Sequence, residues 1–436
     1  MPARVLVVFF LLALLAHPAP AAPKARPVTQ EALDNGLTVV VAENHATDVV
    51  TLNAWVKVGS REETDEINGA AHFVEHLLFK GTRRRKVGAI SLEVESIGGQ
   101  LNASTSFDFT QYYIVAASRF FDLILDIQAD ALMNSTFDPV EVDRERAVVL
   151  QEVALNDDSA VRSGFIQLYS TAYRAHPYRR PVVGRREIIQ RLTRDQLFEF
   201  YRSYYGPANV ILVIAGDVDT AEVMAKVRRV LGAWRHPVQR RPAAPAEPPL
   251  SDVRRAVVTR DVRVATILLG WMGADVRNPD HYALDVLTFV LGQGRGARLT
   301  RSLRDRQQLV QSIGAAFGTS VDPGLFVIQA VADPQQQDRV ELAIHTELTA
   351  LRDQGVTDEE LDRAKTLIEM DTLVDQHTSR GWASAIGYSA TIATLDYHDT
   401  YLDRIRAVTR EDVQRVAARY LDPQRYAIVV VQPRSR

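Results

Sequence analysis

The chain has 436 residues, a net charge of −3 and 46% hydrophobic residues, so it is long enough for more than one domain and can bury substantial cores. Neither sign of charge dominates any long region, which argues against a nucleic-acid partner, because nucleic-acid-binding proteins carry a basic face. The absence of cysteine excludes disulfides, thiol catalysis and cysteine-ligated zinc.

The first 21 residues have the pattern of an export signal. Arg4 gives a positive start, residues 5–16 form an unbroken apolar run, and Ala19-Pro20-Ala21 offers a small-residue cleavage site. This apolar run is too short to span a bilayer, which takes about 20 residues. Cleavage after Ala21 would leave a mature protein without a stable membrane span, located in the periplasm or secreted.

The next predicted elements are strands. Residues 38–41 and 49–58 are apolar and rich in β-branched side chains, which favours strands of a sheet. Residues 98–105 begin with two glycines and continue as a polar, β-capable run, which predicts an exposed edge strand. An ordinary hairpin is the alternative for this last run.

Between these strands, the run His72-Phe73-Val74-Glu75-His76 predicts a metal site on a helix. Positions i and i+4 lie on the same helical face, so His72 and His76 can share one Zn²⁺. Glu75 lies beside them, close enough to act on a metal-activated water. The order H-x-x-E-H is the reverse of H-E-x-x-H. A solvated helix face that carries these residues by chance is the alternative. The basic residues 83–86, which follow the run, are expected to form a solvated loop.

Two further helices are predicted at residues 119–133 and 140–155, where apolar residues recur at three- and four-residue spacing. Catalytic zinc typically has three protein ligands, and the second helix could supply a carboxylate. Its Glu145 and Glu152 are two turns apart and project from nearly the same face, beside an apolar stretch. An unpaired carboxylate beside a buried stripe is costly, and a metal ion would remove that cost. An acidic helix that faces water is the alternative.

The chain also repeats itself at an offset of 216 residues. The pairs at this offset are Trp55 and Trp271, Thr193 and Thr409, Tyr204 and Tyr420, and Pro207 and Pro423. So long a period indicates duplicated domains rather than a solenoid. The proline-rich residues 237–252 predict a linker. We therefore expect an N-terminal domain at 22–236 and a homologous C-terminal domain at 253–436. Strands grouped before and after paired helices predict an α+β fold for each.

The metal motif, followed by Glu152 at a distance of 76 residues, resembles the pitrilysin/insulysin (inverzincin) zinc metallopeptidases. The nearest branch contains the catalytic subunit of the mitochondrial processing peptidase and its bacterial relatives, and the flanking residues 69–71 and 78–82 also read as in that branch. The resemblance covers essentially the whole mature chain. It implies a clamshell of two homologous α+β domains, with the zinc site in the N-terminal domain.

The same resemblance implies a zinc-dependent endopeptidase that cuts peptides or unfolded polypeptides. One Zn²⁺ per chain would be held by His72, His76 and Glu152. Glu75 would be the general base, and Glu145 a catalytically important carboxylate that orients a ligand. In the C-terminal domain, the positions matched to the metal motif are Leu284, Leu287 and Thr288, so no metal is expected there.

The resemblance also implies contacts with a peptide substrate. Asn102 and Ala103 on the predicted edge strand would hold the peptide by β-augmentation. Arg304 matches the arginine of a substrate-contacting Arg/Tyr pair, whereas Gln311 stands at the tyrosine position. We therefore expect a partner, either a homologous paralogue that carries the Arg/Tyr pair or a second copy of this chain.

A rival hypothesis comes from a different class of protein. Peptidase-derived chains can serve as non-catalytic assembly subunits, or can bind peptides without turnover. Such subunits generally have degraded ligand sets, whereas His72, His76, Glu152 and Glu75 are all present here. The Gln311 departure favours the second of these alternatives, a metal-dependent protein that binds peptides without turnover. His176, in a His-Pro-Tyr segment, is expected to be structural rather than a fourth ligand.

Overall fold

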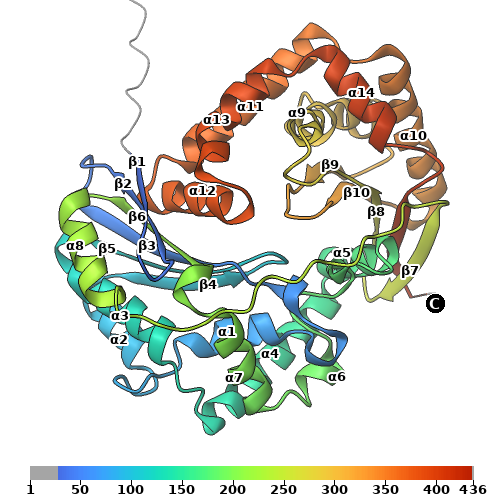
Figure 1. The fold of residues 1–436 in the computed structure, drawn as a ribbon. Coiled ribbons are helices and arrows are strands. Elements are labelled where there is room, and N and C mark those ends of the chain that lie inside the picture. The colour runs from blue at the N-terminus through green and yellow to red at the C-terminus, as the bar shows by residue number, and fades with distance from the viewer. Residues whose placement is uncertain (1–27, 435–436) are drawn as a thin grey trace, which may run out of the picture.

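The computed structural model describes residues 28–434, and the predicted export signal lies outside this range. Two mixed sheets face each other across the molecule, one in each half of the chain (Figure 1). The first has the order β1-β2-β6-β3-β5-β4 and the second the order β7-β11-β8-β10-β9. The strands of the first sheet are β1 (Val28–Ala32), β2 (Thr38–Glu43), β3 (Val49–Val56), β4 (Gln100–Thr105), β5 (Thr110–Ala117) and β6 (Val210–Gly216). Those of the second are β7 (Arg254–Arg260), β8 (Ala265–Met272), β9 (Ser312–Phe317), β10 (Leu325–Ala332) and β11 (Ala427–Pro433).

Helices cover both sheets, so the α+β class predicted from the sequence is confirmed. Those of the first half are α1 (Ala70–Leu78), α2 (Ala89–Ser96), α3 (Phe121–Asn134), α4 (Pro139–Asp158), α5 (Ala160–Ala172), α6 (Arg186–Ile189), α7 (Arg194–Tyr204) and α8 (Thr220–Leu231). Those of the second are α9 (Asp280–Gly292), α10 (Gln337–Gln354), α11 (Asp358–Asp375), α12 (Ser379–Ile392), α13 (Leu395–Ala407) and α14 (Arg410–Tyr420). Within residues 28–434, no helix is both long enough and apolar enough to cross a bilayer.

The repeat seen in the sequence is reproduced by the elements. Helices α7 and α14 begin and end 216 residues apart, and so do strands β3 and β8. The linker predicted at 237–252 runs between α8 and β7 without a helix or strand of its own.

The two halves exchange one helix each, which the sequence did not indicate. Helix α5 of the first half packs across β7, β8 and β11 of the second sheet, and α12 of the second half packs across β3 and β6 of the first. Leu168 of α5 is buried against Leu268, and Trp382 of α12 is buried in one cluster with Trp55. Each exchanged helix therefore covers a sheet face that the other half of the chain leaves open. Separating the two halves would uncover both faces.

A glycine allows each exchanged helix to approach its sheet closely. A Cβ atom on Gly164 would overlap the side chain of Leu268, and one on Gly387 would overlap the indole of Trp55. Larger side chains at these positions would push the helix away from the sheet.

The helix that carries the metal motif is anchored at its N-terminus by a buried carboxylate. Glu63 accepts hydrogen bonds from the backbone N–H groups of Gly69 and Ala71, each at 2.9 Å, and from the Asn68 side chain at 2.8 Å. Gly69 itself has φ +98°, a conformation that favours glycine. Glu63 thus satisfies free N–H groups in the first turn of α1, which the helix cannot satisfy internally, and fixes where α1 begins.

The basic loop after α1 is more buried than we expected. Arg85 is 9% exposed and forms ion pairs with Asp130 at 2.9 Å and Asp126 at 2.7 Å. The expectation of a solvated loop is therefore wrong for Arg85, because acidic residues of α3 lie within its reach. His176, in contrast, is structural as expected, since its ring accepts from Tyr178 N–H and contacts Asp322 at 3.1 Å.

We expect Gly387→Ala and Gly164→Ala to lower the free energy of unfolding by about 1–3 kcal/mol each, because the added methyl group forces an exchanged helix off its sheet. Urea unfolding followed by circular dichroism measures this change. Gly318→Ala is the matched control, since no atom lies within 4 Å of the Cβ it would add. Equal stability of all three variants would contradict the packing described here.

Stability should also depend on pH through Glu63. Burial raises the pKa of its carboxyl group from 4.5 to about 8, against the hydrogen bonds it accepts. The folded chain then binds more protons than the unfolded chain between these two values, so the free energy of unfolding should fall as pH rises from 4.5 to about 8. Glu63→Gln should flatten this dependence, as measured by urea unfolding across the same window. The exposed Glu359→Gln is the control, and parallel pH profiles for all three proteins would refute the assignment.

Candidate metal centre

Helix α1 presents its polar motif on one face because its other face is buried. Phe73, Val74 and Leu77 are at most 1% exposed and belong to the first core. This fixes the rotation of the helix, so that His72 and His76 emerge together, with ring centroids 4.7 Å apart. Glu75, one residue before His76, lies to one side of this pair on the helix.

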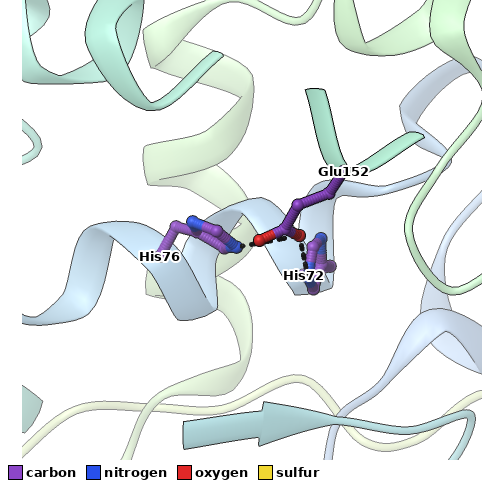
Figure 2. Close-up of side chains that lie close together, drawn as sticks. All are labelled: His72, His76 and Glu152. Atoms are coloured by element: carbon purple, nitrogen blue, oxygen red, sulfur yellow. Dashed lines mark ion pairs between the residues drawn. The ribbon is translucent and has the colours of Figure 1, made fainter. Parts of the chain in front are cut away.

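Helix α4 brings the third predicted ligand to this pair. The side chain of Asp138 caps α4 by accepting from Val140 N–H, and Pro139 occupies its first position. Helices α1 and α4 pack together, and Glu152 points from α4 at both imidazoles (Figure 2). Its Oε2 lies 3.4 Å from His72 Nε2 and 3.5 Å from His76 Nε2.

These distances fit a shared metal ion better than hydrogen bonds. An N–H···O bond is about 2.7–3.2 Å long, whereas ligands at about 2.0–2.1 Å from a tetrahedral zinc ion are roughly 3.3 Å from one another. One donor atom from each of His72, His76 and Glu152 can be chosen so that all three lie within 4.8 Å of one another. The three side chains thus form a set that could hold a metal ion.

The second carboxylate of α4, that of Glu145, contacts the ring nitrogen of His76 that does not face Glu152. Glu145 Oε2 lies 3.1 Å from His76 Nδ1, and its Oε1 lies 2.8 Å from Lys80 Nζ. The Glu145 side chain is 8% exposed, whereas that of Glu152 is 40% exposed. Glu145 therefore accepts the Nδ1 proton of His76, which leaves Nε2 as the free lone pair that faces Glu152.

The environment keeps His72 neutral. Burial, with a smaller contribution from His76, lowers the pKa of the His72 imidazole to about 3. A neutral imidazole has the lone pair that a metal requires, so no proton has to leave His72 before binding at neutral pH.

Glu75 is held by the edge strand. Its Oε2 accepts a hydrogen bond from Thr105 Oγ1 at 2.5 Å. Burial raises the pKa of the Glu75 carboxyl, and the bond from Thr105 opposes this shift. A carboxylate with a raised pKa beside a metal site is suited to accept and return a proton.

The predicted edge strand is confirmed as β4, one of the two edge strands of the first sheet. Asn102 is exposed, and its Oδ1 accepts from the backbone N–H of Ala103 at 2.8 Å. Strand β4 packs against α1, so its free edge lies next to the metal centre and could pair with an extended peptide.

The structure does not bring Arg304 to this centre. Arg304 belongs to the short π-helical segment Thr300–Arg306, which packs on β9 and α10 of the second half. Its guanidinium pairs with the adjacent Asp305 at 2.8 Å. Gln311 is exposed just before β9. Neither residue contacts the metal centre within the described part of the chain.

The second half holds hydrophobic packing where the first has ligands. Leu284 and Leu287 of α9 are fully buried in the second core. Thr288 Oγ1 donates to the carbonyl of Leu284. Two residues of the metal centre were missed in the sequence, Lys80 and Thr105. Only the position of Lys80, four residues after His76, could have indicated its role.

Comparison with known proteins agrees with this geometry. Residues 38–186 match the family model described as Insulinase (Peptidase family M16), and residues 191–368 match the one described as Peptidase M16 inactive domain. An uncharacterized zinc protease of Streptomyces coelicolor is 31% identical over 412 residues, which covers 93% of this chain and 90% of that protein.

Two further relatives extend the match. A probable mitochondrial-processing peptidase subunit beta of Arabidopsis thaliana is 32% identical over 428 residues, 94% of this chain and 79% of that protein. The crystal structure of a protease from Helicobacter pylori superposes with a TM-score of 0.90 at 28% identity, covering 94% of this chain and all of that one. The resemblance stated from the motifs is confirmed, and the chain belongs to peptidase family M16, the insulinase/pitrilysin family.

Proposed function

We propose that this protein is a zinc-dependent endopeptidase that cuts peptides or unfolded polypeptides, with one Zn²⁺ per chain. The observation that carries the proposal is the convergence of His72, His76 and Glu152 at distances that fit one tetrahedral ion. The names of the relatives as zinc proteases support it. Bound to these three side chains, zinc would polarise the carbonyl of a peptide bond and acidify a water molecule.

The chain's own residues perform the remaining tasks. Thr105 occupies Oε2 of Glu75, which leaves Oε1 to accept a proton from the attacking water and return it to the leaving amine. Glu145 orients the His76 ring. Strand β4 aligns the peptide by main-chain hydrogen bonds, and the Asn102 side chain must leave the Ala103 N–H when a peptide docks.

A second chain completes the active unit in this proposal. Arg304 lies in the second half, away from the metal centre, and Gln311 cannot supply a phenolic donor. The resemblance implied a clamshell of the two domains of one chain, but the exchanged helices α5 and α12 hold these two domains together. The clamshell would therefore form between two chains. The partner would be a homologous paralogue with the Arg/Tyr pair or a second copy. The sequence pattern of residues 1–21 supports export to the periplasm or beyond the cell.

Zinc affinity tests the metal centre. The purified chain should bind one zinc ion, and Glu145→Gln should weaken binding about 10–100-fold, because His76 loses the carboxylate that orients it. Competition with a chromophoric chelator measures the affinity. Asp143→Asn, on the same helix with an 80% exposed side chain, is the matched control. Unchanged affinity of Glu145→Gln would remove Glu145 from this role.

Glu75→Gln tests the chemistry. The variant should keep its zinc yet lose turnover by about 10²–10⁴-fold, since the amide cannot accept the proton. Cleavage of a quenched fluorescent peptide library, by each variant alone and with the paralogue added, gives the first reading, and zinc quantified in the same samples gives the second. Substantial residual cleavage would show that Glu75 is not the base. Loss of zinc together with activity would instead assign it to the metal site.

A further inference from the structure

A large cavity lies beside the metal centre but outside it. Its volume is about 1480 Å³, and it is bounded by the β4 edge of the first sheet and by helices α12 and α13 of the second half. Asn102, Ala103 and Ser104 form its border on β4. His72, His76, Glu152 and Glu75 do not line it. The cavity is therefore separate from the residues proposed to bind the metal and to transfer the proton.

The cavity and the metal centre lie on opposite faces of the same edge strand. Thr105 of β4 points to the α1 side, where it binds Glu75. Asn102 and Ser104 point the other way, since neighbouring residues of a strand alternate. They pair with Tyr113 and Gln111 on β5, which also line the cavity.

The packing of β5 also shows that one face of the sheet is turned to α1 and the other to the cavity. On β5, Tyr112 and Ile114 are fully buried in the first core, on the side of α1. Their neighbours Gln111 and Tyr113 are only partly buried and face α12. The guanidinium of Arg380, on α12, donates to the Tyr113 hydroxyl at 3.0 Å.

A peptide that pairs with β4 would show the same alternation. Every second side chain would point to the metal side and every other one to the cavity side. Asn102 and Ser104 are one to three residues from Thr105, and a strand rises about 3.3 Å per residue. The cavity would therefore receive peptide side chains that lie within roughly 10 Å of Thr105 along the strand.

We propose that this cavity is a selectivity site that takes alternate aromatic or large aliphatic side chains of a peptide bound along β4. This inference rests on the proposed function, because its ligand is a peptide. It adds which peptide side chains are selected: aromatic or large aliphatic ones at every second position.

The lining explains the choice of ligand. Aromatic rings from both halves of the chain surround the space: Phe109, Phe317, Trp382, Tyr388, Tyr397 and Tyr401. Apolar and aromatic surfaces of this kind gain free energy by burying apolar side chains. Leu373, which is 48% exposed, lies at the rim and would be covered by such a ligand.

Charged groups at the cavity mostly have partners in the lining itself. Asp285 accepts from the Tyr401 hydroxyl at 3.0 Å, and Asp399 contacts the His398 ring at 3.0 Å. Arg380 is bound to Tyr113 and lies over its ring, 5.6 Å from the centroid. These pairings leave the aromatic surface as the dominant feature offered to a peptide.

The test measures peptide binding rather than cleavage, with the full chain carrying Glu75→Gln. Two fluorescent peptides of identical composition are compared by anisotropy, one with phenylalanine at alternate positions among alanines and one with the same phenylalanines in a single block. We expect the alternating peptide to bind about tenfold more tightly, because it places more rings in the cavity. Equal affinities, or no measurable binding of either peptide, would overturn the proposal.

A filled cavity provides the second arm. Ser384→Trp, on the α12 wall, should remove the preference for the alternating peptide and leave the blocked peptide within about twofold. Leu342→Trp, at a 68% exposed position on α10, is the matched control. If Ser384→Trp unfolds by circular dichroism, Leu373→Asp at the rim replaces it. Equal weakening of both peptides would overturn the proposal.

The same proteins separate this inference from the proposed function. If the chain with native Glu75 binds the alternating peptide selectively but cleaves it neither alone nor with the paralogue added, the peptidase assignment fails and the cavity assignment stands. If it cleaves both peptides at equal rates and binds them alike, the cavity assignment fails and the peptidase assignment stands.

Discussion

The candidate site depends on the packing of α4 against α1. That contact sets two carboxylates against one pair of imidazoles, and each carboxylate has a different environment. Glu152, with an accessible side chain, faces the Nε2 atoms of both rings, whereas the nearly buried Glu145 lies behind His76 and is neutralised by Lys80. Their seven-residue spacing makes this possible, because a rigid helix cannot move one carboxylate without the other. A small rotation of α4 would lose both contacts.

Much of the centre could be predicted because its determinants are local. The spacing of His72, Glu75 and His76 places them on one helical face, and the spacing of Glu145 and Glu152 does the same on another. Periodicity does not determine whether the two helices meet. The residues suggested that the second helix could supply the third ligand but left a solvated helix open, and the resemblance to a family favoured the meeting. The edge position of β4 followed from its glycines and polar residues.

The remaining features arise from contacts between distant residues. Nothing near Glu63 in the sequence distinguishes it from the other acidic residues of its loop, yet it is the carboxylate that caps α1. Arg85 looked solvated because its partners lie on α3, about 40 residues further along the chain. Gly164 and Gly387 resemble any other helical glycine until the opposite sheet is in place. Such features depend on tertiary packing, which a single sequence does not display.

The exchange of helices has a consequence for biosynthesis. Thr51 of β3 bonds to Ser379 at the start of α12, 328 residues later in the chain, so the face of the first sheet that α12 covers stays open until nearly the whole polypeptide has been made. Contacts of such long range slow folding and expose apolar strands to aggregation in the meantime. A ribosome-bound chain would present Trp55 and its neighbours to chaperones, and truncation before α12 would yield an insoluble fragment rather than a working N-terminal domain.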